Sequence, residues 1–565
     1  MYAVPDTLDV QVGSIVRVPL GGRRVRGWVV ATGERPKPGL RPILSVSGDV
    51  AAFDRQLLGV LRWAAARYIA PLSALLAKAS PPNVGRRTTS GAYPPVGDVP
   101  DAGIPGLRAV GSGRGTIVVS GSMPDAALAA LVGGQASAGR SAMVVAATAA
   151  EAEAATEALA ARFGSRVVPG GSRLTGAQAT RSWVAAATIP GTIVVGTREV
   201  AAWPVTGMGL AVVIGEGRRG MKDKATPTVN ARDLLLKRAV VEHFSLVLSG
   251  LVPTAEALSR TGDVLSVDAR SWGLVEVVDR RNDPPGAGLI ADVTAAAIRA
   301  TVAAGKQVFV FTDRRVTTMR CIRCRTIRRC ANCGAAPGGG SECLRCGASV
   351  GACVDCGGRR FQALGAGMAR VVSEVGRVVG SATVGEVASG RQVVVGSERD
   401  LPGLRVDLSV VVDADGPIMA PTYRAAEDAL RLIARVVAAA GAGRGRRAVL
   451  QTMQPDHPVF GALRAGDPIE FVQRDSARRA ALGFPPGGEI LVVEASGLPP
   501  GGGDQLTEEV GDRASVLGPA KTGDALRWLI QARDLTSARV VVRGVVGRWR
   551  ESGARVRVDA DPMDL

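Results

Sequence analysis

All cysteines of the chain lie in one short segment, and their spacing constrains the fold more than any other feature. Eight cysteines fall between Cys321 and Cys356, and none occurs elsewhere in the 565 residues. They form four Cys-x-x-Cys pairs: Cys321/Cys324, Cys330/Cys333, Cys343/Cys346 and Cys353/Cys356. A two-residue gap lets both thiolates of a pair reach one ion, and two pairs complete a tetrahedral shell of four sulfur ligands. We therefore predict two structural zinc ions per chain, with no open position for catalysis.

Disulfide bonds would be the alternative use of these cysteines. The first residues, Met1 to Asp6, lack a basic region followed by an apolar run, so no secretory signal is visible. Paired Cys-x-x-Cys motifs in a large chain without such a signal favour metal over disulfides. No apolar run reaches the length of about 18 residues that suggests a membrane helix. We expect a cytoplasmic protein.

Net charge is the second feature that limits the function. The chain has 69 Lys and Arg residues against 51 Asp and Glu, a formal net charge of +18. Such a balance indicates a polyanionic partner, most simply nucleic acid. The alternative is an Arg-rich composition whose charges are only solvated. Apolar residues make up 46% of the sequence, which is ample for the several packed domains that this length predicts.

The first 85 residues have a pattern of their own. Residues 13–19 and 26–30 read as short strands on either side of a Gly-Gly-Arg-Arg turn. From Phe53 to Ala70 the apolar spacing becomes helical, and Pro71 ends the predicted helix. Residues 86–108 are rich in Pro, Gly, Thr and Ser and are typical of a linker.

The middle of the chain alternates between short apolar strands and Ala-rich helices, which indicates doubly wound parallel α/β sheets. A first set has predicted strands at 116–119, 142–146, 192–195, 210–214 and 246–248, with helices such as 125–131 and 149–161. A second set has strands at 307–311, 392–395 and 408–412 and a helix at 423–439. The cysteines are inserted after the first strand of this second set. From about residue 480 the pattern is β-rich, with a single helix expected near 526–532.

Several short motifs follow one another in a distinctive order. The order begins with Val16–Pro19, Gly21–Arg24, Gly27–Val29 and Tyr68–Leu72. It continues with Gly196-Thr197-Arg198, Trp203-Pro204, Ala231-Arg232-Asp233, Phe311–Arg315, the cysteines, Val412–Asp415, Tyr423–Glu427, Gln451-Thr452, Leu482–Pro486 and Asp559–Pro562. This order resembles the PriA family of primosomal replication-restart helicases, also called primosomal protein N′, over nearly the whole chain.

The resemblance implies a fold and a division into domains. The fold is α/β: two RecA-like helicase lobes with an inserted double zinc-knuckle, plus β-rich N-terminal DNA-binding and C-terminal domains. The implied parts are 1–85 (N-terminal 3′-end DNA-binding domain), 86–108 (linker), 109–275 (first lobe), 276–319 with 359–479 (second lobe), 320–358 (zinc insertion) and 480–565 (C-terminal domain). The resemblance also assigns the outer cysteine pairs (Cys321, Cys324, Cys353, Cys356) to one zinc and the middle pairs (Cys330, Cys333, Cys343, Cys346) to the other.

Arginines supply the candidate DNA contacts. By resemblance, the first domain would recognise the 3′ end of a leading strand at a fork, and its candidate contacts are Arg17, Arg23, Arg24, Arg26 and Trp28. The segment from residue 320 to residue 360 contains eight arginines and only two acidic residues, Glu342 and Asp355. Arginines on rigid zinc knuckles would contact phosphates with little loss of side-chain freedom. Arg328 and Arg329 are the candidates there; the alternative is a solvated charged face. Few aromatic residues accompany them, which argues against a stacking platform for single strands.

The motor motifs of the family are missing from this sequence. A P-loop needs Gly-x4-Gly-Lys-Ser/Thr, and none of the seven lysines stands in that motif. At the aligned place, Ser122 and Pro124 are expected to be the N-cap and first residue of a helix. The Asp-Glu-x-His box is replaced by Gly215–Arg218, and the arginine-finger region reads Ala440–Arg446, which favours a basic surface loop. We predict that hydrolysis is lost and that ATP is not a working cofactor.

No other catalytic constellation is apparent. His243 and His457 are the two histidines of the chain, and both are expected to be structural. We therefore predict a replication-restart protein that binds stalled or abandoned forks and promotes primosome assembly and loading of the replicative helicase. Forked DNA, primosome proteins, the replicative helicase or its loader, and single-stranded DNA-binding protein are its partners by resemblance, and nucleoid association follows. Two alternatives stay open: an ATP-driven 3′-to-5′ helicase with an unrecognised nucleotide site, and a zinc-ribbon module that binds RNA or protein.

Overall fold

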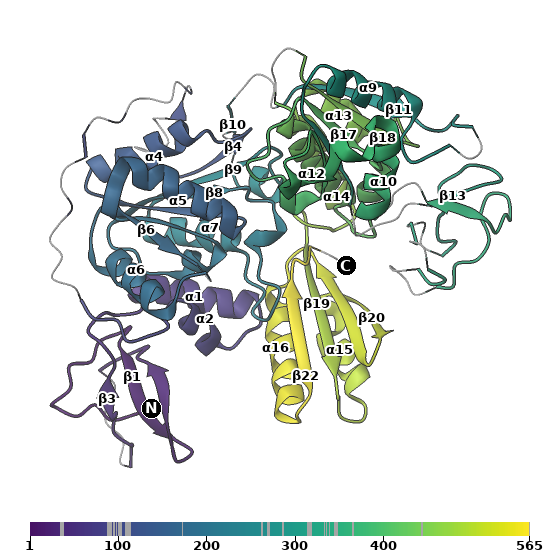
Figure 1. Ribbon diagram of the computed structural model, residues 1–565. Coiled ribbons are helices and arrows are strands. Elements are labelled where there is room, and N and C mark those ends of the chain that lie inside the picture. The colour runs from purple at the N-terminus through teal and green to yellow at the C-terminus, as the bar shows by residue number, and fades with distance from the viewer. Residues whose placement is uncertain are drawn as a thin grey trace. The chain divides into compact units, whose positions relative to one another are not determined.

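The computed structural model divides the chain into two compact units (Figure 1). It describes residues 1–33, 39–87, 115–171, 173–261, 264–267, 272–284, 287–313, 319–332, 340–343, 348–363, 367–441 and 445–563, with 93, 96, 97, 99, 104, 106, 107, 334, 336 and 337 between them. Unit 1 contains residues 1–250, 256–267 and 483–562. Unit 2 contains residues 251–255, 268–482 and 563–565. The predicted 86–108 linker falls mostly outside the described residues.

Unit 1 begins with a small antiparallel sheet followed by two helices. Strands β1 (Ile15–Leu20), β2 (Arg23–Trp28) and β3 (Ser45–Val46) pair in the order β2-β1-β3. Helix α1 (Arg55–Arg67) begins where the Asp54 side chain accepts a hydrogen bond from the Leu57 amide at 2.8 Å. Helix α2 (Leu72–Lys78) follows Pro71. The predicted strands and helix are confirmed, with α1 ending at Arg67, ahead of the expected Ala70.

The first lobe is a seven-stranded sheet in which every paired strand is parallel, with the order β10-β4-β9-β8-β5-β7-β6. Its elements are β4 (Thr116–Ser120), α4 (Asp125–Ser137), β5 (Ser141–Ala146), α5 (Ala149–Phe163), β6 (Val167–Gly170), α6 (Gly176–Thr188), β7 (Ile193–Gly196), β8 (Met208–Ile214), α7 (Ala231–Glu242), β9 (Ser245–Gly250), α8 (Ala255–Leu258) and β10 (Val264–Ser266).

Both faces of this sheet are buried, which explains its continuous apolar strands. Within β5, Ala142 and Val144 pack with α4 and α5 on one face. Met143 and Val145, which alternate with them, pack with α6 and α7 on the other face.

The second lobe, in unit 2, has a six-stranded parallel sheet of order β11-β18-β17-β12-β16-β15. Its elements are β11 (Leu274–Asp279), α9 (Asp292–Ala303), β12 (Val308–Phe311), α10 (Met368–Val379), β15 (Val384–Glu386), β16 (Val393–Gly396), β17 (Leu408–Val411), α11 (Asp415–Ile418), α12 (Ala425–Ala439), β18 (Arg447–Thr452), α13 (Pro458–Ala465) and α14 (Ile469–Ala481). The cysteine segment follows β12 and is bounded by the antiparallel strands β13 (Met319–Cys321) and β14 (Phe361–Ala363).

The C-terminal part of unit 1 is an antiparallel sheet of order β20-β21-β19-β22. Its elements are β19 (Glu489–Ser496), α15 (Gly502–Val510), β20 (Ser515–Thr522), β21 (Ala525–Ala532), α16 (Thr536–Glu551) and β22 (Arg555–Ala560). The helix predicted near 526–532 is wrong, because this segment is β21. Trp528 and Ile530 are fully buried while their neighbours are half-exposed, a period of two that belongs to a strand.

Ion pairs join the three parts of unit 1. Arg67 of α1 forms ion pairs with Glu489 of β19, at 3.0 Å, and with Asp561 just after β22. Lys222, in the loop before α7, donates to Asp559 at 2.6 Å and to the Ala560 carbonyl at 2.7 Å. The apolar cluster of α1, α7 and α16 is shared as well.

The predicted fold class is confirmed: two parallel α/β sheets, with antiparallel sheets at both ends of the chain. Among the helices that the structure describes, none combines the length and the apolarity needed to cross a membrane.

Candidate nucleic-acid interface and metal centre

The register of β1 and β2 decides which N-terminal candidates share a face. Arg17 lies directly opposite Arg26, and Pro19 lies opposite Arg24. Trp28 lies opposite Ile15, in phase with these pairs. Residues directly opposite one another, and residues two apart along a strand, point to the same side of a sheet. Arg17, Arg24, Arg26 and Trp28 therefore form one basic face.

Arg23 does not belong to this face. It pairs with Leu20, one position out of phase, and so points to the opposite side of the sheet. That side carries Val16 and Val18, which are buried with Val29 and Ile43 in a small apolar cluster. The predicted five-residue group is therefore split into four side chains on one face and one on the other.

Residues just after helix α2 hold two side chains of the basic face in place. The indole NH of Trp28 donates to Ser80 Oγ at 2.7 Å, and the Ser80 hydroxyl donates in turn to the Leu76 carbonyl. Arg26 lies 5.6 Å from the centre of the Trp28 ring and donates to the Pro81 carbonyl at 3.0 Å. Arg17 and Arg24 are exposed. Hydrogen bonds therefore hold Arg26 and Trp28 in place, whereas the side chains of Arg17 and Arg24 are exposed to solvent.

The electrostatics of this face favour an anion. Burial and, after it, the charge of Arg17 lower the pKa of the Arg26 guanidinium. Like charges directly opposite in a sheet destabilise the pair. None of the residues paired between β1 and β2 is acidic. A phosphate placed between Arg17 and Arg26 would remove this repulsion and accept hydrogen bonds from both.

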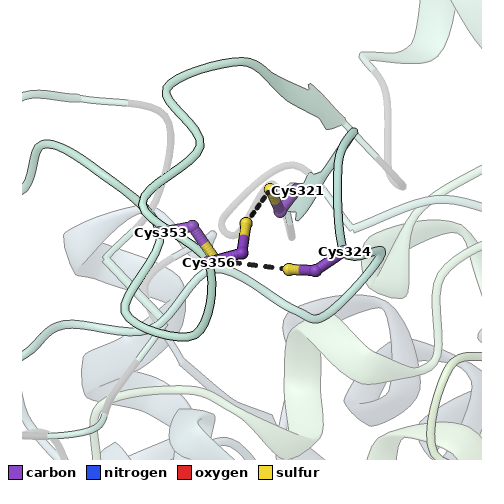
Figure 2. Close-up of side chains that lie close together, drawn as sticks. All are labelled: Cys321, Cys324, Cys353 and Cys356. Atoms are coloured by element: carbon purple, nitrogen blue, oxygen red, sulfur yellow. Dashed lines mark hydrogen bonds between the residues drawn. The ribbon is translucent and has the colours of Figure 1, made fainter.

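The second site is a cluster of four cysteines from two knuckles. Cys321 ends β13 and Cys324 lies in the turn that follows, whereas Cys353 and Cys356 come from the turn before β14. Figure 2 shows the four sulfur atoms turned toward one another, and all lie within 4.8 Å. The Cys321–Cys356 and Cys324–Cys353 sulfur distances are 3.6 and 3.5 Å.

These distances fit a zinc ion. Four sulfurs at about 2.3 Å from a tetrahedral Zn²⁺ lie about 3.8 Å from one another, close to the distances found here. Cys321 and Cys353 are buried, and Cys324 and Cys356 are half-buried, so the cluster is closed on one side. The chemistry of the donor set therefore suits a structural metal ion.

The backbone of each knuckle is shaped for this cluster. The Cys321 amide donates to the Thr326 carbonyl, and the Cys353 amide donates to the Gly358 carbonyl. A Cβ on Gly358 would lie only 3.0 Å from Cys321 Sγ, so this approach requires a glycine. Hydrogen bonds from the Thr326 side chain and amide lower the pKa of the Cys324 thiol to about 6. The thiolate, which is the form that binds metal, is thus favoured.

The second predicted zinc set is only partly described. Cys330 and Cys343 are buried and pack with Val350. Their partners Cys333 and Cys346 lie outside the described residues. The second zinc ion therefore stays a prediction.

Of the two knuckle arginines predicted to touch DNA, one is buried. Arg328 donates to the carbonyls of Gly340 and Val350, and its guanidinium lies 4.6 Å from the centre of the Phe361 ring. These contacts hold the knuckles to β14, so Arg328 is placed to stabilise the insertion. Arg329 is exposed.

The loop that aligns with the family's P-loop is filled by the protein itself. The amide of Gly121 donates to the Gly250 carbonyl at 3.1 Å. A Cβ on Gly121 would lie 3.0 Å from the Cβ of Val267, and Val267 and Met123 are both partly buried against the core of the first lobe. The predicted cap is wrong: the N-cap is Pro124, without a side-chain hydrogen bond, because Ser122 precedes it by two residues.

The remaining motor-motif residues are engaged in structure. Glu216 is buried and pairs with Arg232 at 3.3 Å. Burial opposes the charge of Arg232, but Asp233, Glu216 and Glu256 outweigh it and raise the Arg232 pKa. Arg446 donates to the Val406 and Ala440 carbonyls at the end of α12, and Arg444 lies outside the described residues.

Both histidines lie at helix ends. His243 ends α7 in a left-handed conformation. His457 precedes α13, and its Nδ1 accepts a hydrogen bond from the Val459 amide at 3.3 Å. Burial and the charge of Arg478 lower the pKa of His457, which favours the neutral ring that this bond needs.

Comparisons with known proteins bear on these sites. The model of the PriA 3′ DNA-binding domain (3′BD) matches residues 1–81, the segment that contains the basic face. The protein of Mycobacterium leprae named "Probable replication restart protein PriA" is 29% identical over 59% of this chain and 57% of its own length. PriA of Mycobacterium tuberculosis is 27% identical over 68% of each, and PriA of Thermotoga maritima is 26% identical over 66% and 55%. The chain thus aligns with little more than half to about two thirds of these relatives.

Solved structures give weaker likenesses. RecG bound to a three-way DNA junction superposes with a TM-score of 0.38 at 12% identity, over 64% of this chain and 43% of that one. The helicase MrfA bound to DNA gives 0.37 at 11%, over 70% and 59%. The stronger similarity comes from the sequence matches: the model of the PriA 3′ DNA-binding domain matches the N-terminus, and curated PriA proteins of several bacteria align with more of the chain. On these matches, the chain is similar to the PriA family of replication restart proteins.

Proposed function

We propose that this protein binds stalled or abandoned replication forks and promotes primosome assembly and loading of the replicative helicase, without helicase activity of its own. The observation that carries the proposal is the basic face of β1 and β2. It lies inside the segment that matches a 3′ DNA-binding domain, and its opposed arginines favour an anion.

The basic face would hold the 3′ end of a leading strand. Arg17 and Arg24 are exposed and would contact backbone phosphates. Arg26 and Trp28 are anchored to the end of α2 and would fix the register of the strand beside them. Because phosphate contacts release counterions, affinity should fall steeply as salt rises.

The knuckles would hold two structural zinc ions per chain. Cys321, Cys324, Cys353 and Cys356 would bind the first, and their sulfur distances support it. Cys330, Cys333, Cys343 and Cys346 would bind the second. A closed shell of four thiolates leaves no position for a substrate, so the ions would fix the shape of the insertion. Arg329 is the exposed knuckle arginine that we retain as a candidate DNA contact.

The two lobes would act as a frame without a motor. Phosphoryl transfer needs a P-loop lysine, a hydroxyl and a carboxylate for Mg²⁺, and usually an arginine finger. The sequence lacks the first three at the aligned positions. The contacts of Gly121 and Glu216 support this, because an apolar side chain covers the glycine and a buried arginine pairs with the carboxylate.

The wider roles of the protein follow from the family. Primosome proteins, the replicative helicase or its loader, and single-stranded DNA-binding protein would be its protein partners. It would work in the cytoplasm, associated with the nucleoid. The six-part domain division, with boundaries at 85, 108, 275, 319, 358 and 479, stays part of this proposal.

Fork binding can be tested with zinc-loaded full-length protein and three labelled DNAs. These are a fork with a leading-strand 3′ end at the junction, the same fork without that end, and a plain duplex. We expect the first to bind at least tenfold more tightly than the duplex. Arg17→Gln should weaken fork binding, while Arg23→Gln, on the opposite face, should weaken it less. Equal affinity for all three DNAs would instead favour a general zinc-ribbon module.

The enzyme alternative needs its own assay. Phosphate release from ATP should stay at background with each of the three DNAs present. Robust ATP hydrolysis stimulated by forked DNA would favour an active ATP-driven helicase and would refute this part of the proposal.

A further inference from the structure

Two aliphatic side chains stand exposed at matching positions of the two knuckles. Ile322 follows Cys321 and is 52% exposed, and Val354 follows Cys353 and is 48% exposed. Each occupies the first position between two cysteines of the same four-cysteine cluster. A knuckle closed by a metal ion leaves little room to fold such a side chain inward, because the cysteines at both ends of the turn point toward the ion. The cluster therefore presents two apolar side chains to solvent on rigid backbone.

Arginines are interleaved with these two side chains. The Ile322 amide donates to the Arg360 carbonyl at 3.0 Å, which places Arg360 beside the first knuckle. Arg323 donates to the Cys356 carbonyl at 3.3 Å, which places it against the second knuckle. Arg323, Arg359 and Arg360 are all exposed. Asp355, the acidic residue of these turns, accepts a hydrogen bond from Thr326 Oγ1 at 2.6 Å. We call Ile322, Arg323, Val354, Arg359 and Arg360 the knuckle tip.

We propose that the knuckle tip docks on the end of the duplex at the fork junction. Ile322 and Val354 would lie against the last base pair, in the place of the first unpaired nucleotide, while the tip arginines contact the flanking phosphates. A duplex end is a flat apolar surface bordered by negative charge, which complements two aliphatic side chains within a rim of arginines. Apolar side chains of this kind enter base steps in other DNA complexes and unstack them.

A protein partner fits the knuckle tip less well. Stable protein interfaces bury about 1,200–2,000 Å² in total, and their central contacts are enriched in Trp, Tyr and Arg. Besides its three arginines, the tip offers only two aliphatic side chains and no aromatic ring. A single strand running across it would also prefer aromatic stacking partners. This role of the knuckle tip rests on the proposed fork binding, and it makes the knuckle tip the element that contacts the fork junction.

The test uses zinc-loaded full-length protein and forked DNA with 2-aminopurine as the first unpaired nucleotide. Stacking on the duplex quenches this base, so we expect its fluorescence to rise at least twofold when wild-type protein binds. The variant I322S/V354S should lose most of the rise. The matched control L274S/V293S, which changes two exposed aliphatic residues of the second lobe, should keep it. A probe moved about six base pairs into the duplex should not respond.

Anisotropy on the same DNA separates the two proposals. Intact fork binding without a fluorescence rise in wild type, or with an equal rise in I322S/V354S, would overturn the docking proposal alone. Absence of fork binding would overturn both. A photoreactive benzophenone amino acid at Val354 gives a second readout that does not depend on the double variant folding. Crosslinks to the junction nucleotides are expected, and crosslinks confined to the duplex interior, or none, would refute the docking.

Discussion

Arg17 and Arg26 lie directly opposite each other in the β1–β2 pair, so two positive charges face one another across a sheet. The repulsion lowers the pKa of Arg26, after the larger effect of its burial. Without a bound anion, this pair is electrostatically unfavourable. The pair therefore predicts opposite effects of one substitution on stability and on DNA binding.

Arg17→Gln should raise stability slightly and weaken DNA binding. Removing one of two like charges opposite each other should stabilise the sheet by about 0.2–1 kcal/mol. Loss of one phosphate contact should reduce the slope of log affinity against log salt by about 0.7 for a single strand. Thermal unfolding and binding titrations at several salt concentrations measure the two effects. Arg23→Gln is the control, and an equal change of slope there would contradict the assignment of faces.

Metal content should be two zinc ions per chain, and Cys353→Ser should lower it to about one. Serine is a poor zinc ligand, so the outer set loses a quarter of its shell. Cys330→Ser should remove the other ion in the same way and leave both lobes folded. Metal analysis of reduced, dialysed protein measures this, with Ala352→Ser as the control because it places the same side chain beside the cluster. One ion in the wild type would refute the two-site prediction.

Glu216 should matter for stability and not for catalysis. Its carboxylate pairs with buried Arg232, which keeps Asp233 and Glu256 as further partners. Glu216→Ala should therefore lower the free energy of unfolding by about 1–3 kcal/mol. Glu157→Ala, on an exposed position of α5, should have almost no effect. A DNA-dependent ATPase in the wild type that Glu216→Ala abolishes would show that the residue still serves a motor.

Unit 1 should lose stability in acid through Glu489. Burial opposes ionisation of this carboxylate, but the Leu535 amide, Arg539 and Arg67 outweigh it and lower its pKa. A carboxylate whose folded pKa is lowered contributes stability above its unfolded pKa, about 4.3. That contribution disappears as pH falls through the lower folded value. Melting temperatures between pH 6 and 3 should show the decline in wild type and a shallower one in Glu489→Gln. Glu508→Gln, which is exposed, should behave as wild type.

The sequence predicted the parallel strands well because they are short, apolar and separated by Ala-rich helices. It missed β18 (Arg447–Thr452) and the edge strands β6, β10, β11 and β15, which contain or adjoin polar residues or are only three or four residues long. It also placed a helix on β21, because the run Leu526–Ala532 is nearly continuous in apolar residues. Only the alternating burial of Trp528 and Ile530 reveals the strand, and that alternation depends on the partner strands.

Of the candidate sites, the cysteine knuckles could be predicted from spacing, since two residues between ligands suffice to form a knuckle, whereas the grouping of the two outer pairs into one cluster came from the family resemblance. The basic face could not, because membership depends on the register of β1 and β2, and one position separates Arg23 from Arg24. The burial of Arg328 could not be predicted from the sequence either. Its partners are the carbonyls of Gly340 and Val350 and the ring of Phe361, none of which is adjacent to it in sequence.

The ion pairs that close unit 1 also order the events of folding. Arg67 and Lys222 pair with Asp561 and Asp559, partners more than 300 residues further along the chain. During synthesis the whole of residues 268–482 leaves the ribosome before those partners do. Domains generally fold as units as they emerge, so the second lobe can fold while Arg67 and Lys222 still lack these carboxylates. Until residues 559–561 have been synthesised, the Lys222 ammonium has no carboxylate partner and must stay hydrated. The surface of the first lobe around Lys222 must therefore remain accessible to the C-terminal segment when that segment emerges.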